Sequence, residues 1–422
     1  MKFDTIIIGG GLSSLVCGIK LQKAGRKCLI VSAGQNALHF SSGTFGLLGR
    51  LPDGTEVTEP LKVLFSLPAE HPYSKMGTDK VAEYAAAVPG FFADCGITLH
   101  RASGSASGEF PRNGWRMTPM GSLKPAWLAM EDVDLIPSKD TRFGEKALIV
   151  NFSGFLDFNT RFVAQGLEKM GTECRIEFVK IKDVEAIRKN PTEMRSVNIA
   201  RVMNLEENWK GLAHQVQSLI NGEDVVILPE VFGFADPHVT GWLREMIPAR
   251  LVFIGTMPPS VPGIRAQMLL KKAFESAGGT FLAGDVALDP AFDGDRVTSL
   301  RTSNLGDVTL EADTFVLASG NLFGKGLVSS PTAVEEPVFG LDVDYPSDRK
   351  DWCNRDFFAK QDFSGFGVRT TSGFKALKGG AVVGNLYVAG SEVGGCNPLY
   401  EGSGAGVAIL TAMNVADNIL SI

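Results

Sequence analysis

Residues 3–31 read FDTIIIGGGLSSLVCGIKLQKAGRKCLIV, and this stretch decides the expected fold. Residues 3–8 are rich in β-branched side chains, which is typical of a buried parallel strand. Apolar residues then recur at helical spacing over residues 12–19, and Gly25 is a helix stop signal. Residues 27–31 are a second apolar run of the strand type. The stretch therefore predicts a strand–helix–strand unit of a parallel sheet.

Three consecutive glycines separate the first expected strand from the helix. Gly9 permits a tight turn, Gly10 follows it, and Gly11 lets the backbone approach a phosphate without a Cβ clash. The N–H groups at the helix start and the positive end of the helix dipole then favour an anion. Ser14 stands where a third glycine or alanine would pack the helix against the strand. The pattern predicts a phosphate site at these four residues, with an ordinary glycine turn as the alternative.

The end of the second expected strand lacks a residue that dinucleotide-binding folds usually have. An Asp or Glu about 20 residues past the glycines normally binds the adenosine ribose. Here the strand ends in Val31, Ser32, Ala33 and Gly34. A serine makes one neutral hydrogen bond and cannot act as a charged bidentate acceptor. This weakens the prediction of a dinucleotide and makes a ligand without an AMP half plausible.

The C-terminal third continues the alternation of strands and helices. The pattern predicts a helix over 267–277, strands over 280–282, 296–300, 308–310, 314–320 and 385–390, and a final helix. We therefore expect an α/β, Rossmann-like domain that is discontinuous, formed by residues 1–45 and 256–422. Residues 46–255 are interrupted by prolines and contain three more strand-like runs. They are expected to form an inserted α/β domain for a substrate or a partner.

Composition and charge exclude several classes of protein. The 422 residues include 41 basic and 47 acidic side chains without a basic tract, so nucleic-acid binding is not expected. No run of 18 apolar residues predicts a transmembrane helix, and the first residues do not form a signal peptide. The six cysteines lie far apart without a CxxC pair. We therefore expect no metal or iron–sulfur site, and free thiols in a reducing cytoplasm.

A second glycine cluster precedes the final helix. Gly390, Ser391 and Glu392 follow the last strand, and Gly404 stands where the helix opens. A helix N-terminus at this position would stabilise negative charge developing on a ring such as a reduced flavin. Plain loop glycines are the alternative. The presence of the first strand–helix–strand unit favours the cofactor interpretation.

These motifs carry a resemblance to a known family. The glycines at 9–11, the strand end Ala318-Ser319-Gly320 and the stretch LYVAGSEVGG at 386–395 resemble the two-motif flavoprotein fold of the succinate dehydrogenase and fumarate reductase class. More closely, the chain resembles the B-subunit family of anaerobic glycerol-3-phosphate dehydrogenases. The similar stretches are ALHFSSG at 37–43, AEHPYS at 69–74, VNIAR at 197–201, EENW at 206–209, PPSVPGIR at 258–265 and FGLDV at 339–343. They extend over nearly the whole chain.

The resemblance implies an activity and an assembly. It implies oxidation of sn-glycerol 3-phosphate to dihydroxyacetone phosphate, with two electrons passed through a flavin to a quinone. It also implies two partners, the catalytic A-type subunit and the membrane-associated, iron–sulfur C-type subunit, which would hold this cytoplasmic chain at the inner face of the membrane. The implied cofactor is FMN, in agreement with Ser32, and FAD is the alternative. A free-standing flavin oxidoreductase and an assembly scaffold without a cofactor are the competing hypotheses.

Two residues are candidates for the chemistry. His39 follows the second strand, and a neutral imidazole there would accept or relay a proton during alcohol oxidation. Arg265 follows the proline-rich stretch at 258–264, which is expected to be a rigid turn that aims a guanidinium at the substrate phosphate. A structural histidine and a surface arginine are the alternatives. Ser41, Ser42 and Gly43 are candidates for contacts to phosphate or ring, and Gly320 and Glu392 for the cofactor.

Overall fold

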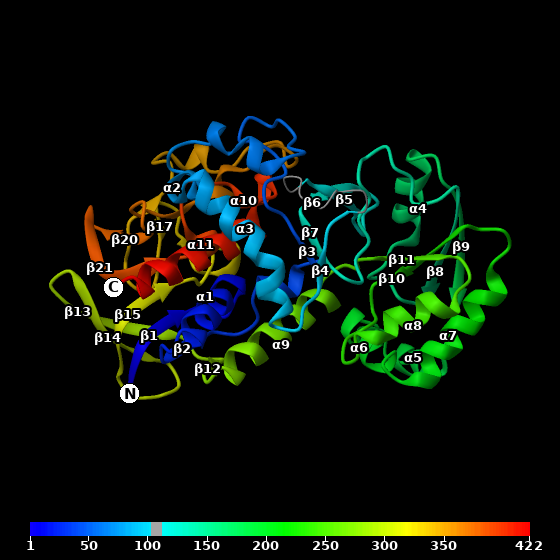
Figure 1. The fold of residues 1–422 in the computed structure, drawn as a ribbon, viewed down its shortest axis with the longest axis horizontal. Coiled ribbons are helices and arrows are strands. Elements are labelled where there is room, and N and C mark those ends of the chain that lie inside the picture. The colour runs from blue at the N-terminus through cyan, green and yellow to red at the C-terminus, as the bar shows by residue number, and fades with distance from the viewer. Residues whose placement is uncertain (103–111) are drawn as a thin grey trace. The chain divides into compact units, whose positions relative to one another are not determined.

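The computed structural model describes residues 1–102 and 112–422. These residues divide into two compact units. Unit 1 contains Met1–Ala37, Gly46–Gly96 and Gln267–Ile422, and unit 2 contains Leu38–Phe45 and Ile97–Ala266. Each unit has strands and helices that alternate along the chain (Figure 1). The predicted α/β fold class is confirmed.

Unit 1 is built on an eight-stranded sheet. Its strands are β1 (Lys2–Ile8), β2 (Cys28–Ser32), β12 (Thr280–Ala283), β13 (Ala287–Asp293), β14 (Arg296–Thr302), β15 (Leu310–Leu317), β20 (Lys375–Lys378) and β21 (Ala381–Val388). The strands β12, β2, β1, β15 and β21 are neighbours in this order and run parallel. The two strands predicted at 308–310 and 314–320 are one strand, β15. Parallel strands of this type are buried on both faces, which explains the continuous apolar run of β1.

Two helices from opposite ends of the chain lie side by side in unit 1. The helix α1 (Leu12–Lys23) packs along α11 (Gly404–Leu420) (Figure 1). Both are largely buried, α1 from Ser13 to Ile19 and α11 from Gly406 to Ala416. The other helices of this unit are α2 (Pro72–Met76), α3 (Thr78–Ala93) and α10 (Pro398–Glu401), and its short strands are β16 (Val328–Ser329), β17 (Val334–Glu335), β18 (Val343–Asp344) and β19 (Gly367–Val368).

Residues 46–96 belong to unit 1, whereas the sequence had indicated that they form part of the inserted domain. The Gly406 N–H on α11 donates to the Gly46 carbonyl oxygen, and the Tyr84 hydroxyl on α3 donates to the Asp417 carboxylate on α11. These contacts join this segment to the last helix of the chain. The prolines that suggested a new domain here instead interrupt a segment that covers α11.

Unit 2 contains a four-stranded parallel sheet of its own. Its strands are β8 (Lys146–Phe152), β9 (Glu173–Val179), β10 (Val225–Pro229) and β11 (Arg250–Ile254), in the order β11-β10-β8-β9. The helices that connect them are α4 (Thr160–Lys169), α5 (Lys182–Arg188), α6 (Ser196–Val202), α7 (Glu206–Leu219) and α8 (His238–Met246). Figure 1 shows α4 on one side of this sheet and α7 and α8 on the other. The sheet is therefore doubly wound, and its strands β8, β10 and β11 lie at the three runs that the sequence indicated, whereas β9 was not predicted.

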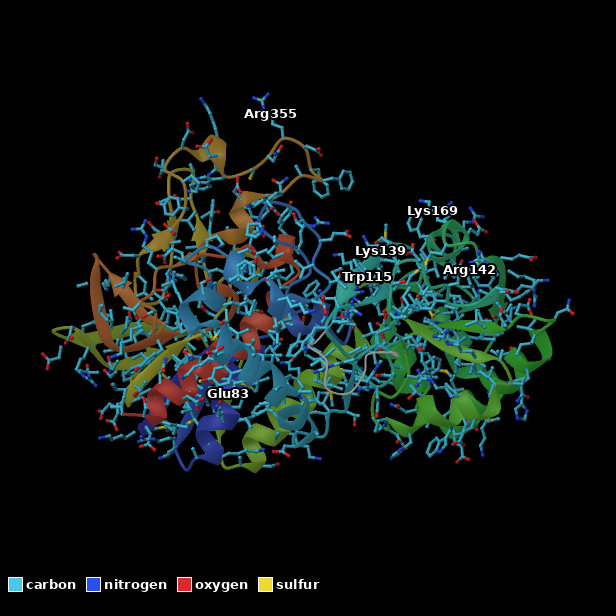
Figure 2. All side chains as sticks on the ribbon, turned by 45° about the horizontal axis from the view of Figure 1, so that its top comes forward. Glu83, Trp115, Lys139, Arg142, Lys169 and Arg355 are labelled. Carbon is cyan, nitrogen blue, oxygen red and sulfur yellow. The ribbon has the colours of Figure 1, made fainter. Side chains whose placement is uncertain are left out.

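The remaining strands of unit 2 form two small sheets. They are β3 (Thr44–Phe45), β4 (Leu99–His100) and β7 (Leu128–Met130) in one sheet, and the hairpin β5 (Gly114–Met117) and β6 (Leu123–Ala126) in the other. On the hairpin, the Trp115 ring is covered by the Lys139 ammonium, 4.4 Å from the ring centroid (Figure 2). The chain passes from unit 2 back to unit 1 within the helix α9 (Val261–Ser276). This helix begins earlier than predicted, inside the stretch that was expected to be a rigid turn.

Candidate functional site

The parallel register of unit 1 brings the predicted cofactor residues to one edge of its sheet. Ile8 at the end of β1 is paired with Val31 of β2 and with Leu317 of β15, and Leu317 is paired with Val388 of β21. The loops that follow these strands hold the glycines at 9–11, Ser32, the strand end at 318–320 and the second glycine cluster. Ligands of open α/β sheets bind beyond the carboxyl ends of the strands. The structure therefore gathers both glycine clusters where a ligand is expected.

The three glycines after β1 differ in what a Cβ at each position would contact. Gly9 has a φ of +115°, and a Cβ there would overlap the Ala318 carbonyl oxygen. A Cβ on Gly10 would overlap the Ser32 hydroxyl. A Cβ on Gly11 would meet only the Asn36 Cβ, at 4.0 Å. The fold itself thus requires Gly9 and Gly10, whereas the space in front of Gly11 is left open by the protein.

The open space at Gly11 coincides with a helix N-terminus. Gly11 is the N-cap residue of α1, no side chain caps it, and the first turn holds no acidic residue. The first N–H groups of a helix have no partner within the helix, and the positive end of its dipole attracts an anion. The Asn36 side chain, which sequence reasoning missed, donates to the Gly10 carbonyl oxygen at 2.7 Å and supports the loop from behind. This arrangement fits a phosphate group of a bound cofactor.

The two serines predicted near this phosphate are engaged within the protein. Ser14 is fully buried, and its hydroxyl donates to the Ala318 carbonyl oxygen at 3.4 Å. Ser32 is also buried, and its hydroxyl donates to the Gly34 carbonyl oxygen at 3.2 Å. Ser14 therefore performs the packing role expected of the third glycine position, and neither hydroxyl is directed to a ligand. The second strand ends without a carboxylate, as the sequence indicated.

Glu392 has a structural role that the sequence did not reveal. Its side chain is fully buried and accepts hydrogen bonds from the backbone N–H groups of Ser319 and Gly320, at 2.8 and 3.1 Å, and from the Ser319 hydroxyl. Burial, and next the nearby Glu336 carboxyl, raise the pKa of Glu392 well above its usual range, against these hydrogen bonds. Glu392 thus joins the loop after β15 to the loop after β21. Its carboxyl group is occupied there, in contrast to the predicted direct cofactor contact.

The glycines of the second cluster permit close packing beside this carboxyl group. Gly320 and Gly390 have φ values of +98° and +84°, which favour glycine. The N–H of Gly390 donates to the Thr411 hydroxyl on α11 at 2.8 Å, and a Cβ there would overlap the Ser13 hydroxyl on α1. Ser391 follows it and is half-buried. Gly390 therefore fixes the approach of β21 to the two long helices.

The N-terminus of α11 is held by a buried network centred on Glu401. Gly404 is the first residue of α11, and Ser403 precedes it. The His71 Nδ1 atom accepts a hydrogen bond from the Tyr73 N–H, so the Nε2 atom carries the proton and donates to Glu401 at 3.2 Å. Glu401 also accepts from the Ser403 hydroxyl at 3.0 Å. Burial raises the pKa of Glu401, but the hydrogen bonds from His71, the Asn397 N–H and the Ser403 hydroxyl outweigh it and the pKa is lowered.

The same network contains the candidate metal ligands. Within residues 1–102 and 112–422, His71, Cys396 and Glu401 have ligand atoms that all lie within 4.8 Å of one another. The His71 and Glu401 atoms already bond to each other. Burial, and next the Glu401 charge, raise the pKa of the Cys396 thiol well above its usual range, which opposes the thiolate that a metal requires. We interpret the group as a hydrogen-bond network that supports α11.

The predicted residues at 39–43 lie in unit 2, with the start of α9. The Ser260 N–H donates to the His39 carbonyl oxygen at 2.8 Å. A Cβ on Gly43 would lie 2.7 Å from the Pro262 side chain, and a Cβ on Gly263 would overlap the Leu38 carbonyl oxygen. The glycine at 263 therefore allows α9 to begin directly against this segment.

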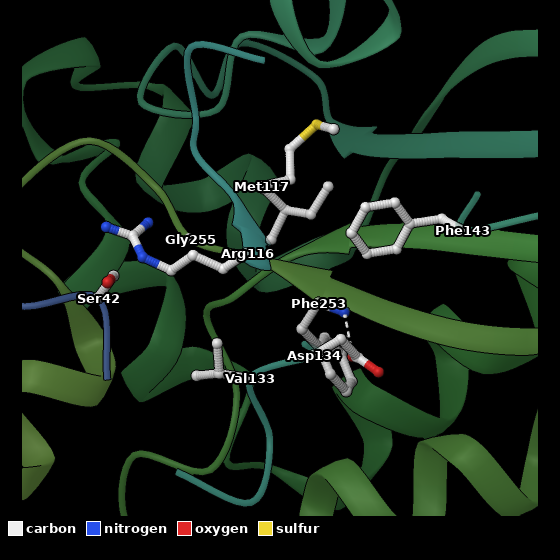
Figure 3. A pocket seen from close by; sticks show the side chains of 9 residues that line it. Ser42, Arg116, Met117, Val133, Asp134, Phe143, Phe253 and Gly255 are labelled. Atoms are coloured by element: carbon white, nitrogen blue, oxygen red, sulfur yellow. Dashed lines mark hydrogen bonds between the residues drawn. The ribbon is translucent and has the colours of Figure 1, made fainter. Parts of the chain in front are cut away.

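The serines of this segment belong to unit 2 and make local contacts there. The Ser41 N–H donates to the Leu38 carbonyl oxygen, and the Ser42 hydroxyl is 3.0 Å from the Thr44 hydroxyl. Ser42 also lines a small pocket of unit 2 together with Arg116 and Gly255 (Figure 3). The sequence had suggested that these serines and Gly43 belong to the flavin domain. Their cofactor contacts remain predictions.

Arg265 does not present a guanidinium to a ligand in the predicted way. It lies one turn inside α9, is 5% exposed, and donates to both carboxylate oxygens of Asp132, at 2.5 and 2.6 Å. It also donates to the Gly233 carbonyl oxygen at 3.0 Å. Burial lowers the pKa of Arg265, and the Asp132 charge and hydrogen bonds raise it by more. Because the stretch before it is helical and not a turn, the side chain is directed to an internal ion pair.

Comparison with known proteins places the chain in a family. The family model of the FAD binding domain matches residues 4–407. The B subunit of the anaerobic glycerol-3-phosphate dehydrogenase of Pectobacterium carotovorum is 40% identical over 423 residues, which cover 100% of this chain and 99% of the relative. The corresponding protein of Yersinia enterocolitica is 41% identical with the same coverage. The chain belongs to the B-subunit family of anaerobic glycerol-3-phosphate dehydrogenases. As a member of this family, it is a flavoprotein of the oxidoreductase class.

Some solved structures also match this chain over its whole length, at much lower sequence identity. The 3-ketosteroid Δ1-dehydrogenase of Sterolibacterium denitrificans is 11% identical with a TM-score of 0.45, covering 100% of this chain and 99% of that chain. The glycine oxidase of Geobacillus kaustophilus is 14% identical with a TM-score of 0.35, covering 100% and 95%. Among the described helices, none is long and apolar enough to cross a membrane.

Proposed function

We propose that this chain is the flavin-carrying subunit of a respiratory anaerobic glycerol-3-phosphate dehydrogenase. In this role it takes part in the oxidation of sn-glycerol 3-phosphate to dihydroxyacetone phosphate. The alcohol loses two electrons and two protons, and a quinone receives them as the final acceptor. The observation that carries the proposal is the match over the whole chain to B-subunit relatives, at about 40% identity, together with the open glycine cradle at Gly11.

The cofactor would be held at the carboxyl edge of the unit 1 sheet. The backbone at 10–12 and the N-terminus of α1 would bind a phosphate group, and Gly404 at the start of α11 offers a second uncapped helix end. When bound, the flavin supplies the two-electron acceptor for the alcohol. Glu392 and Glu401 would support the site indirectly, since their carboxyl groups hold the two loops and the start of α11 in place.

We propose FAD as the flavin, because the family model that matches is that of an FAD binding domain. FMN, which the family resemblance implies and with which the missing carboxylate at the end of β2 agrees, is the alternative outcome. The buried Ser32 hydroxyl is bonded to Gly34, so an adenosine ribose would contact backbone or more distal side chains. Mass identification of the flavin extracted from the purified protein separates the two forms.

Partners are part of the proposal. The free cysteines of the described residues are Cys17, Cys28, Cys95, Cys174, Cys353 and Cys396. They are scattered along the chain and form no CxxC pair, so electron delivery to a quinone would need an iron–sulfur partner. We propose the catalytic A-type subunit and the membrane-associated, iron–sulfur C-type subunit of the same complex in this role. Through them the chain would be held at the cytoplasmic face of the membrane.

The proposal is tested by isolating the chain with its partners. The complex is co-expressed, purified and examined for flavin content, iron content and the reduction of a soluble quinone by glycerol 3-phosphate. We expect flavin in this chain, iron in a co-purifying protein, and quinone reduction that requires both. A colourless chain that takes up neither FAD nor FMN would contradict the cofactor assignment. A yellow chain that works alone would favour a free-standing oxidoreductase.

A further inference from the structure

A loop of unit 1 presents two adjacent phenylalanines to solvent. Residues 354–361, the phenylalanine loop, lie between β18 and β19. In this loop Phe357 and Phe358 are 84% and 93% exposed, and their rings contact each other edge to face with the centroids 5.4 Å apart. Figure 2 shows Arg355 of the same loop on a segment that extends outward from unit 1. Large apolar side chains that are grouped and exposed typically mark an interaction surface.

The phenylalanine loop is held in its conformation by its own hydrogen bonds. The Gln361 side chain accepts from the Asn354 N–H at 2.9 Å and donates to the Asp356 and Ala359 carbonyl oxygens, at 2.8 and 3.2 Å. The Asp356 carboxylate accepts from the Phe358 N–H at 3.0 Å. Because these bonds already order the loop, a partner that covers the two rings does not have to order it on binding, and less free energy is lost.

The phenylalanine loop is fixed to the helix α10, where a third apolar side chain is exposed. The Asn397 side chain, which caps α10, donates to the Gln361 carbonyl oxygen at 2.9 Å. The Lys360 ammonium lies 5.6 Å from the centroid of the Tyr400 ring. Leu399 stands between these two residues of α10 in the chain and is 74% exposed. Leu399 and the two rings therefore lie in the same region of the unit 1 surface.

The two rings are large enough to anchor a protein interface. An aromatic side chain buries about 150–250 Å² when it is fully covered, so two of them account for about 300–500 Å². A stable protein interface buries about 800 Å² on each partner, with a few aromatic or arginine anchors near its centre and polar residues around them. The phenylalanine loop therefore supplies the anchors of such an interface, and the polar surface around it supplies the rim.

The charges around the two rings favour a protein over a lipid surface. The segment 348–362 holds acidic and basic side chains in equal number, so it has no net positive charge that an anionic bilayer would attract. Arg355 is exposed and makes no hydrogen bond or ion pair with the residues that the structure describes. Arginine and aromatic residues are both enriched in protein interfaces. The surface that fits this loop is therefore an apolar groove with an acidic group at its edge.

We propose that the phenylalanine loop is the docking site for another subunit of the dehydrogenase complex. The two rings insert into an apolar groove of that protein, and Arg355 pairs with a carboxylate at the edge of the groove. The relatives of this chain are named as B subunits, which supports a complex of several proteins. The identity of the docked protein as the A-type or the C-type subunit rests on the proposed function.

The first test measures binding to the partner subunits without turnover. The full chain is titrated with the purified A-type and C-type subunits, for the wild type, Phe357→Ser, Phe358→Ser and the double variant. Each single substitution should weaken the binding of the docked subunit by about 30-fold, the size expected for a lost aromatic anchor, and the double substitution by about 100-fold or more. Arg355→Gln should weaken it by about threefold, with a larger effect at low salt.

The control is Leu156→Ser, because Leu156 is a large apolar residue of unit 2 that is 85% exposed. This variant loses a comparable apolar side chain and should bind the subunit as the wild type does. The flavin content and the thermal unfolding temperature of every variant should equal those of the wild type, because exposed side chains contribute little to stability. A loss of flavin or stability that accounts for the weaker binding of the double variant would overturn the proposal.

The second test uses the wild-type chain and the cysteine that precedes the loop. Cys353 is the exposed one of the six cysteines, whereas Cys174 is half-buried and the other four are buried. Alkylation by a maleimide, followed by peptide mass spectrometry, therefore reports whether the surface at Cys353 is covered. We expect the docked subunit to suppress alkylation of Cys353 and to leave that of Cys174 unchanged.

Three results would overturn the assignment of this surface. They are subunit binding that persists in the double variant, alkylation of Cys353 that proceeds equally fast in the complex, and a wild-type chain that binds neither subunit. The last result would also contradict the proposed partners, whereas the first two leave the proposed function intact.

Two other occupants are tested with the wild type and the double variant. Sedimentation measures the association of two copies of this chain, and flotation measures binding to vesicles of phosphatidylethanolamine and phosphatidylglycerol. We expect the two proteins to behave alike in both measurements. If the wild type associates in either one and the double variant does not, the loop serves that occupant and the proposal is wrong.

Discussion

Substitution of Gly11 distinguishes an effect on folding stability from an effect on flavin binding. Gly11 has a φ of −85° and lies at the N-cap of α1. Any L-residue adopts this conformation, and a Cβ would contact only the Asn36 Cβ at 4.0 Å. We therefore expect Gly11→Val and Gly11→Ala to fold. Gly11→Ala should change the free energy of unfolding by less than about 1 kcal/mol, because the reduced freedom of the unfolded chain is opposed by the poorer N-cap that alanine makes.

The same side chain stands where the phosphate would approach the backbone. If a Cβ at residue 11 removes two hydrogen bonds between backbone N–H groups and the phosphate, each contributing about 1.5 kcal/mol, the affinity falls by about 3 kcal/mol. A loss of this size corresponds to a flavin affinity roughly 100-fold lower. Gly11→Val should be affected more than Gly11→Ala, since its branched side chain fills more of the cradle.

The assay compares flavin content with stability. Each variant is purified, its bound flavin is measured by absorption, and the flavin-free protein is unfolded by denaturant. Gly9→Ala is the matched control: Gly9 has a φ of +115°, and its Cβ would overlap the Ala318 carbonyl oxygen, so this variant should lose stability itself. If Gly11→Val retains the full flavin content, the phosphate has been assigned to the wrong loop. If it fails to fold, the cradle is not open.

Three further predictions concern buried charged groups. Because the pKa of Glu392 is raised in the folded state, the free energy of unfolding should fall as the pH rises from about 4.5 through the folded-state pKa, and Glu392→Gln should flatten this dependence in denaturant titrations at several pH values. The pKa of Glu401 is lowered, so its contribution is present above about pH 4.5 and is lost as the pH falls; Glu401→Gln should cost about 2 kcal/mol at neutral pH, and an unchanged stability would contradict the network. Arg265→Ala leaves the Asp132 carboxylate buried without its partner, so the free energy of unfolding should fall by about 3–5 kcal/mol, measured as a lower unfolding temperature. Unchanged stability together with lost binding of the substrate phosphate would instead indicate that Arg265 is a ligand residue.

Much of the unit 1 core was predictable because its signals are local. The β-branched run, the three glycines and the helical spacing after them are close together in the sequence, and they predicted β1, α1 and β2 closely. The apolar runs of β10 and β11 were equally clear. The domain boundary was not predictable in the same way. Residues 46–96 belong to unit 1 through contacts such as those of Tyr84 with Asp417 and of Gly46 with Gly406, and no local pattern reports a contact with the last helix of the chain.

The sequence by itself determined the class of fold, the glycine turn before α1 and the resemblance that led to the family. Only the tertiary structure decided what the charged side chains do. Arg265 meets Asp132 across 133 positions, and Glu392 meets Ser319 across 73, so each partner is invisible to periodicity. Local patterns are set by backbone geometry, whereas the fate of a buried charge depends on which distant segment is packed against it.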